Sequence, residues 1–115
     1  MTQGSPTAHE RWVWQLEQLT KDRVGEYVTI EILDPAHGDG QAAERLPFAY
    51  AAYDPRDDVV VIAVGGNTPT YPVVLRHMIW HPTEVAVDAD IGALKVVEKE
   101  GTTTITSFHR PPGQA

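Results

Sequence analysis

The spacing of apolar residues changes once along this 115-residue chain, and that change limits the folds open to it. Trp12, Leu16 and Leu19 recur at helical spacing, with Val13 at the edge of the same face. From Glu26 onward, apolar residues instead alternate with polar ones, which is typical of strands with one buried face. The pattern predicts one helix followed only by strands.

The predicted helix carries capping signals at both ends. Thr7 and Glu10 fit a capping box, in which the hydroxyl and the carboxylate each accept a hydrogen bond from a free amide. Ser5 followed by Pro6 is an alternative start, because proline suits the first helical turn. We expect the helix to stop shortly before Gly25, which would act as a left-handed terminator.

The remainder of the chain divides into strands separated by turn residues. Residues 26–32 form the first strand, and residues 34–45 are interpreted as a polar loop with two glycines. Further strands are predicted at residues 46–53, 59–64, 73–81, 84–88, 93–99 and 102–108. The segment 59–64 is apolar on both faces and is therefore expected to be central.

Short connections between these strands favour consecutive antiparallel hairpins, because parallel pairing requires long crossovers. The predicted fold class is α+β, with an N-terminal helix packed on a strongly curled antiparallel sheet of six to seven strands. A small, partly open barrel is the expected closure, because it limits exposed strand edges. We expect a single domain over residues 1–115, with an ordered core at about residues 7–109 and flexible termini.

Composition argues against several kinds of binding partner and several kinds of chemical site. Nine Lys and Arg residues against sixteen Asp and Glu residues give a net charge of −7, which would repel nucleic acid and anionic membranes. The chain has no cysteine, so disulfides, thiolate nucleophiles and cysteine-based zinc sites are excluded. No signal peptide is visible, and the longest apolar run, residues 59–64, is too short to span a bilayer. We therefore expect a cytoplasmic protein.

The segment from Arg76 to Pro82 holds the densest chemistry in the chain. Its two imidazoles, His77 and His81, lie four residues apart, which is about 13 Å on a strand. A single metal ion needs both nitrogens within about 2.1 Å, so this pair does not predict a metal site. We expect no metal and no cofactor here. One histidine should be a hydrogen-bonded inward group, and the other should sit at the strand end.

Other clusters of polar residues are interpreted as turns. Residues 34–40 hold two aspartates and a histidine, but a calcium loop requires more ligands and a closing glutamate. Residues 54–58 and 88–90 are typical of hairpin turns. Residues 65–68 follow an apolar strand but lack the Lys-Ser/Thr pair of a phosphate-binding loop. No catalytic signature is found, although carboxylates can still pair in space.

Two surfaces are predicted to expose large apolar side chains. Trp14 lies about 160° from the centre of the helix's apolar face and should point outward. In the strand over residues 73–81, the inward set is Leu75, His77 and Ile79, and the outward set is Val74, Arg76, Met78 and Trp80. The alternative is that both sheet faces are covered, or that the helix rotates to bury Trp14.

These features lead to two functional hypotheses. The first is a non-enzymatic protein-interaction module, self-associating or binding another protein through Trp14, Arg76, His77, Met78 and Trp80. The alternative is a small-molecule-binding protein or enzyme with a pocket near the 76–82 strand. In that pocket His77 would anchor the ligand with Tyr50 or Tyr53, and Arg76 would hold a carboxylate or phosphate.

A set of short motifs resembles a known family. The motifs are Trp12–Leu19, Gly25–Glu31, Leu46–Phe48, Tyr53–Pro55, Asp57–Val59, Arg76–Ile79 with Pro82, and Gly101–Phe108. Together they resemble a family of small bacterial proteins that is a domain of unknown function. The resemblance covers roughly residues 12–108. It implies a bacterial, cytoplasmic, single-domain protein, and it carries no activity or functional residue with it.

Overall fold

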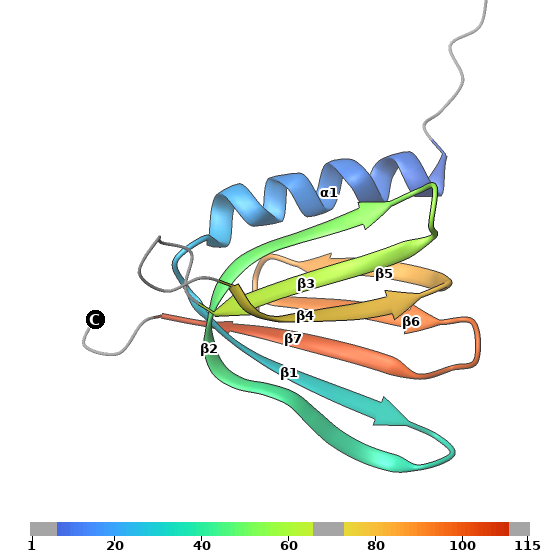
Figure 1. Cartoon of the computed structure of the whole chain (residues 1–115). Coiled ribbons are helices and arrows are strands. Elements are labelled where there is room, and N and C mark those ends of the chain that lie inside the picture. The colour runs from blue at the N-terminus through green and yellow to red at the C-terminus, as the bar shows by residue number, and fades with distance from the viewer. Residues whose placement is uncertain (1–6, 66–72, 111–115) are drawn as a thin grey trace, which may run out of the picture.

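The computed structural model describes residues 7–65 and 73–110 and shows a helix packed on an antiparallel sheet (Figure 1). The elements are α1 (Ala8–Arg23), β1 (Tyr27–Asp34), β2 (Gly38–Asp54), β3 (Val59–Gly65), β4 (Val73–Trp80), β5 (Pro82–Asp88), β6 (Ala93–Glu98) and β7 (Thr103–His109). The alternative helix start, the 65–68 loop beyond Gly65 and the chain ends lie outside the described residues. Among the described residues, no helix has the length and apolar character needed to cross a membrane.

Both ends of α1 follow the capping signals in the sequence. The Thr7 hydroxyl accepts a hydrogen bond from the Glu10 amide at 3.1 Å, and the Glu10 carboxylate accepts one from the Thr7 amide at 2.8 Å. The chain leaves the helix at Val24 and turns at Gly25, whose φ of 91° favours glycine. The predicted capping box and terminator are therefore confirmed.

Helix α1 covers a strand edge as well as a core face. Trp12, Leu16 and Leu19 are buried, as predicted. The Thr20 hydroxyl lies 3.0 Å from both the backbone nitrogen and the carbonyl oxygen of Ala51 in β2. At this point β2 has left β1, so a helix side chain supplies the hydrogen bonds that a neighbouring strand would otherwise make.

The strands form one sheet in the order β4-β3-β2-β1-β7-β6-β5. All pairs are antiparallel, and β3 is buried on both faces, as its apolar sequence predicted. One predicted hairpin is wrong, because β4 and β5 follow each other in the chain yet lie at opposite ends of the sheet order. The first and last strands, β1 and β7, pair instead.

His81 alone joins β4 to β5, and its backbone conformation explains why they do not form a hairpin. Its φ is 55°, which turns the chain out of the plane of β4. Its amide donates to the Asp58 carbonyl at 2.8 Å, and its carbonyl accepts from the Lys99 amide at 3.0 Å. The connection is thus fixed between the β2–β3 turn and the β6–β7 turn.

The predicted polar loop at residues 34–45 is also wrong. The turn occupies only the residues between Asp34 and Gly38, and β2 then runs for 17 residues. Its first part pairs with β1 and its second with β3, and it changes direction near Arg45, whose φ is 49°. Most residues from 38 to 45 project into solvent, so the alternation that marks a half-buried strand is missing.

The sheet is not closed or strongly curled, so the predicted barrel is wrong. In the described residues the two end strands do not hydrogen-bond to each other. The core is shared by α1 and all seven strands, with Ile62 and Ile79 in the same cluster as Leu94 and Val96. The change of direction within β2 and the cover given by α1 account for this burial without strand closure (Figure 1).

Candidate interaction surface on strand β4

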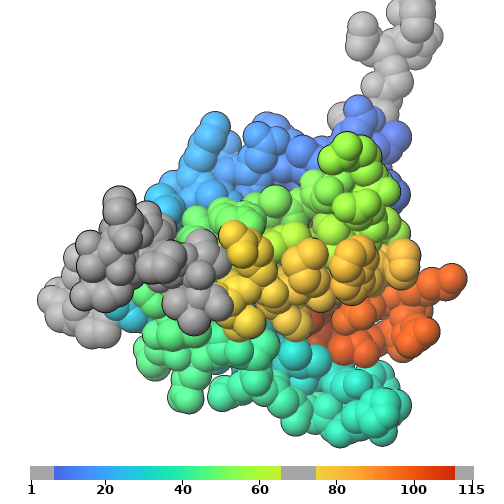
Figure 2. Space-filling model, viewed as in Figure 1, coloured from blue at the N-terminus to red at the C-terminus, as the bar shows by residue number. Residues whose placement is uncertain are grey.

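The side chains of β4 alternate between core and solvent. Leu75 is half-buried against the core and Ile79 is 1% exposed. Arg76, Met78 and Trp80 point outward, and Met78 and Trp80 are 40% and 48% exposed. The alternation matches the sequence prediction; the side chain of Val74 lies outside the described residues. Figure 2 shows the β4 side chains, coloured yellow to orange, at the surface.

Among the residues that the structure describes, none pairs with one edge of the β4 backbone, because this strand ends the sheet order. The register places Val59 opposite Trp80, and the His81 amide donates to the Asp58 carbonyl at 2.8 Å. In an antiparallel pair, hydrogen-bonded positions alternate with positions whose backbone groups point the other way. The amides and carbonyls of Arg76, Met78 and Trp80 therefore point to the free edge.

The outward residues of β4 are tied to the sheet at one point. The Arg76 Nε donates to the Tyr50 hydroxyl at 3.2 Å. Since Arg76 pairs with Ala63 and Ala63 pairs with Tyr50, the arginine side chain reaches across β3. Its methylene stem consequently lies along the outer face of the sheet, beside Met78. We define Arg76, Met78 and Trp80 as the β4 strip.

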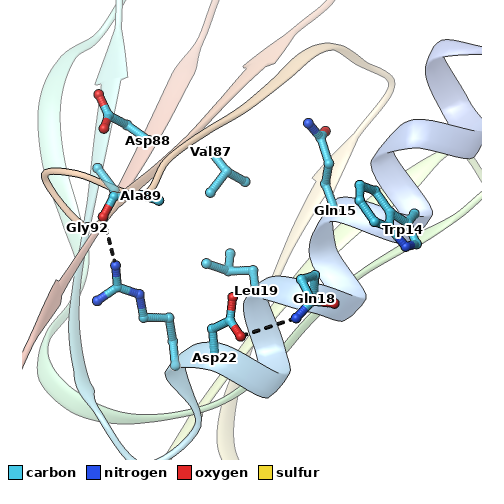
Figure 3. A pocket seen from close by; sticks show the side chains of 11 residues that line it. Trp14, Gln15, Gln18, Leu19, Asp22, Val87, Asp88, Ala89 and Gly92 are labelled. Atoms are coloured by element: carbon cyan, nitrogen blue, oxygen red, sulfur yellow. Dashed lines mark hydrogen bonds between the residues drawn. The ribbon is translucent and has the colours of Figure 1, made fainter.

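Trp14 belongs to a different surface. It is 67% exposed, as predicted, and lines a groove of about 290 Å³ between α1 and the β5–β6 turn. Figure 3 shows Leu19 and Val87 facing each other across this groove, with Trp14 at one end. Arg23 closes the other end by donating to the Ala89 carbonyl at 3.1 Å. The structure thus separates Trp14 from the β4 residues with which the sequence grouped it.

His77 points inward from the middle of β4 and is half-buried. Burial lowers the pKa of its imidazole, because desolvation disfavours the charged form. The His77 ring makes no hydrogen bond to any residue in the ranges 7–65 and 73–110. The sequence prediction of a hydrogen-bonded inward histidine is therefore right about the direction of the side chain and wrong about the hydrogen bond. An inward, uncharged His77 does not contribute to the exposed strip.

Three residues form a network that sequence reasoning missed. The Tyr53 hydroxyl donates to one Asp58 carboxylate oxygen at 2.7 Å, and the His81 Nδ1 lies 3.2 Å from the other. Asp58 and His81 both have positive φ, 53° and 55°. Burial, with the hydrogen bond to Asp58, raises the pKa of Tyr53 to about 12. The sequence predicts only a turn role for Asp58.

One feature of the sequence points to this network, namely the second aspartate of the Asp57-Asp58 pair. A turn at residues 54–57 needs no further aspartate, so the second carboxylate of the Asp57-Asp58 pair was available for another role. The Tyr53 hydrogen bond is the largest effect lowering the Asp58 pKa. The network ties the β2–β3 turn to His81, the residue that follows Trp80 at the end of β4.

A small hollow adjoins the end of β4. It measures about 190 Å³ and is lined by Trp80, His81, Glu98, Lys99 and Glu100. Burial, followed by repulsion from Glu100 and Asp34, raises the pKa of Glu98. The residues predicted to anchor a small molecule do not line it; these are His77, Tyr50, Tyr53 and Arg76. Arg76 bonds instead to Tyr50, and Tyr53 bonds to Asp58.

Asp34 and Asp88 serve turns. The Asp34 carboxylate accepts from the amides of Ala36 and His37, and Asp88 accepts from those of Asp90 and Ile91. These local bonds explain the turn composition recognised in the sequence. Within the described part of the chain, no group of three potential metal ligands comes together.

Comparison with known proteins adds family context. A family model described as a family of unknown function (DUF5335) matches residues 5–114. An uncharacterized protein of Aquifex aeolicus (strain VF5) is 33% identical over 99 residues, covering 84% of this chain and 83% of the relative. No solved structure matches the chain.

Proposed function

The chain belongs to this family of unknown function, and from its surface we propose a non-enzymatic protein-interaction module that self-associates through the β4 strip. One observation carries the proposal: Arg76, Met78 and Trp80 combine exposed side chains with unpaired backbone groups on an edge strand. Such an edge is a ready template for another strand. Trp, Met and Arg are also the residue types enriched in interfaces.

The two ends of the sheet differ in how they are protected. Strand β5 begins with Pro82, which has no amide to donate, and it exposes Glu84, which pairs with Lys95 at 2.9 Å. Proline and charge are the usual means of preventing edge-to-edge pairing. From residue 75 to residue 80, β4 has neither a proline nor a carboxylate. The contrast supports β4, and not β5, as the associating edge.

Charge also favours β4 as the contact between two acidic molecules. The chain carries a net charge of −7, so two copies repel each other over most of their surfaces. Arg76 is the one permanently charged side chain between residues 75 and 80, and it is positive. When two copies meet through residues 75–80, these residues therefore place no carboxylate at the contact, and repulsion between the two acidic chains is lower there than elsewhere.

Light scattering across a concentration series tests self-association. We expect the wild-type mass to rise from monomer to dimer, and Met78→Glu to remain a monomer, because it places like charges at the centre of the strip. Trp14→Glu is the matched control, since it changes another exposed apolar residue on a different surface, and it should behave as the wild type. A monomeric wild type, or dissociation by Trp14→Glu alone, would contradict the proposal.

The hollow beside Trp80 and His81 supports a second candidate, a small-molecule-binding protein or enzyme. Its exposed indole could stack on a ligand, and the Asp58 carboxylate orients the imidazole through Nδ1. Its volume of about 190 Å³ is below the roughly 300–1,000 Å³ typical of ligand pockets. A concentration-independent monomer whose tryptophan fluorescence responds to small molecules, with the response lost in Trp80→Phe, would favour this candidate.

A further inference from the structure

We propose that two copies pair β4 with β4 in antiparallel orientation about a two-fold axis through Met78, placing Arg76 of each copy opposite Trp80 of the other. This inference rests on the proposed function and specifies its geometry. A two-fold interface uses the same patch on both copies, so the strip has to be complementary to itself. The sequence Arg-x-Met-x-Trp is self-complementary when Met78 faces Met78.

The backbone limits the registers that an added strand can adopt. Arg76, Met78 and Trp80 present their amides and carbonyls to the free edge. With Met78 on the axis, each of the three residues donates one hydrogen bond and accepts one, and all of these bonds are made within the strip. Leu75, His77 and Ile79 remain bonded to β3.

Neighbouring registers lose part of this pairing. An axis through Ile79 would put Arg76 opposite Pro82, which has no amide to donate. An axis through His77 would put Trp80 opposite Val74, beside the register shift where β4 leaves its regular pairing with β3. The Met78 axis is therefore the register in which the regular part of the edge pairs with itself.

Side chains on the outer face favour the same register. Tyr50 holds the Arg76 guanidinium over β3 at 3.2 Å, so the arginine presents its stem along the sheet surface. An indole directly opposite can pack against the part of that stem nearest β4, which adds apolar contact across the pair. At the axis, the two Met78 side chains meet and fill the space between these pairs.

Cysteine cross-linking tests the register directly, because the natural chain has no cysteine. Residues that face each other in a hydrogen-bonded antiparallel pair have Cα atoms about 5.5 Å apart, within the range that a disulfide spans. Met78→Cys should therefore form a disulfide-linked dimer under mild oxidation. It should do so at least about tenfold faster than Trp14→Cys, an exposed control, because association raises the effective thiol concentration.

Off-axis variants supply the second measurement. Arg76→Cys alone and Trp80→Cys alone should not cross-link above the control, since the like residues would be about 13 Å apart. An equal mixture of the two variants should give the heterodimer. Circular dichroism of each variant before oxidation verifies that it is folded.

The outcomes separate the register from self-association itself. Cross-linking through Met78→Cys and through the mixed pair supports the proposal. A wild type that is dimeric by light scattering, with Met78→Cys no faster than Trp14→Cys, overturns the register and leaves self-association standing. A wild type that stays monomeric overturns both. Preferential linking of Met78→Cys with Arg76→Cys would assign the axis to His77 instead.

Discussion

Two buried threonines on β7 should limit the stability of this domain. Thr104 and Thr106 are both 0% exposed, and their hydroxyls have no hydrogen-bond partner within the described residues. Thr106 lies between Ile30 of β1 and Leu94 of β6 in the pairing of the strands. Valine has nearly the same shape as threonine and carries a methyl group in place of the hydroxyl. The double substitution Thr104→Val/Thr106→Val should therefore stabilise the fold.

The expected gain follows from the energy of an unpaired buried hydroxyl. Burying such a group without a hydrogen bond costs about 1–3 kcal/mol in proteins. The two residues share one face of one strand and can couple, so only the lower end of this range is used for each. Taking the lower end for each gives about 2 kcal/mol for the double variant. In a domain of this size that corresponds to an increase in Tm of about 8 °C.

Urea and thermal unfolding, followed by circular dichroism, measure the change. Thr103→Val is the matched control, because Thr103 is half-buried on the opposite face of β7 and its hydroxyl reaches the Gly101 carbonyl at 3.5 Å. The control should change the unfolding free energy by less than about 0.5 kcal/mol. A loss of stability in the double variant would refute the reasoning, since it would mean that both hydroxyls make hydrogen bonds in solution.

Two further predictions concern titratable groups. Burial lowers the pKa of His77, so the contribution of uncharged His77 to the unfolding free energy is complete above the ordinary pKa of 6.5 and falls as the pH drops below that value. Urea unfolding between pH 5 and 8 should show this fall in the unfolding free energy. In the variant His77→Gln, the unfolding free energy should depend less on pH. Tyr53→Phe should lower the unfolding free energy by about 1.5 kcal/mol, the lower end for a hydrogen bond to a charged group, because the Asp58 side chain is 38% exposed. The same variant should raise the Asp58 pKa towards its ordinary value and so reduce the loss of stability in acid, and an unchanged carboxyl titration by NMR would argue against it.

Local signals in the sequence were sufficient for the helix and for the orientation of β4. The Thr7 and Glu10 capping box and the exposure of Trp14 depend on residues within a few positions of one another. The alternation that points Met78 and Trp80 outward is likewise a property of the strand itself. Such features do not require knowledge of which strands are neighbours, and for that reason they could be predicted.

Features that depend on strand order could not be predicted. The exposed first part of β2 has no buried face to reveal a strand, so its sequence predicts a loop. The one-residue connection at His81 suggested a hairpin, whereas its hydrogen bonds to Asp58 and Lys99 carry the chain to the opposite end of the sheet order. Consequently, neither the edge position of β4 nor the network around Asp58 was visible in the sequence.

Amide hydrogen exchange on β4 at low and high protein concentration tests the central claim most directly. The amides of Leu75, His77 and Ile79 bond to β3 and should be protected at every concentration. Those of Arg76, Met78 and Trp80 should exchange rapidly in dilute solution and become protected as the copies associate. Protection that is the same at both concentrations, or that increases at the Trp14 groove and not on β4, would contradict association through this edge.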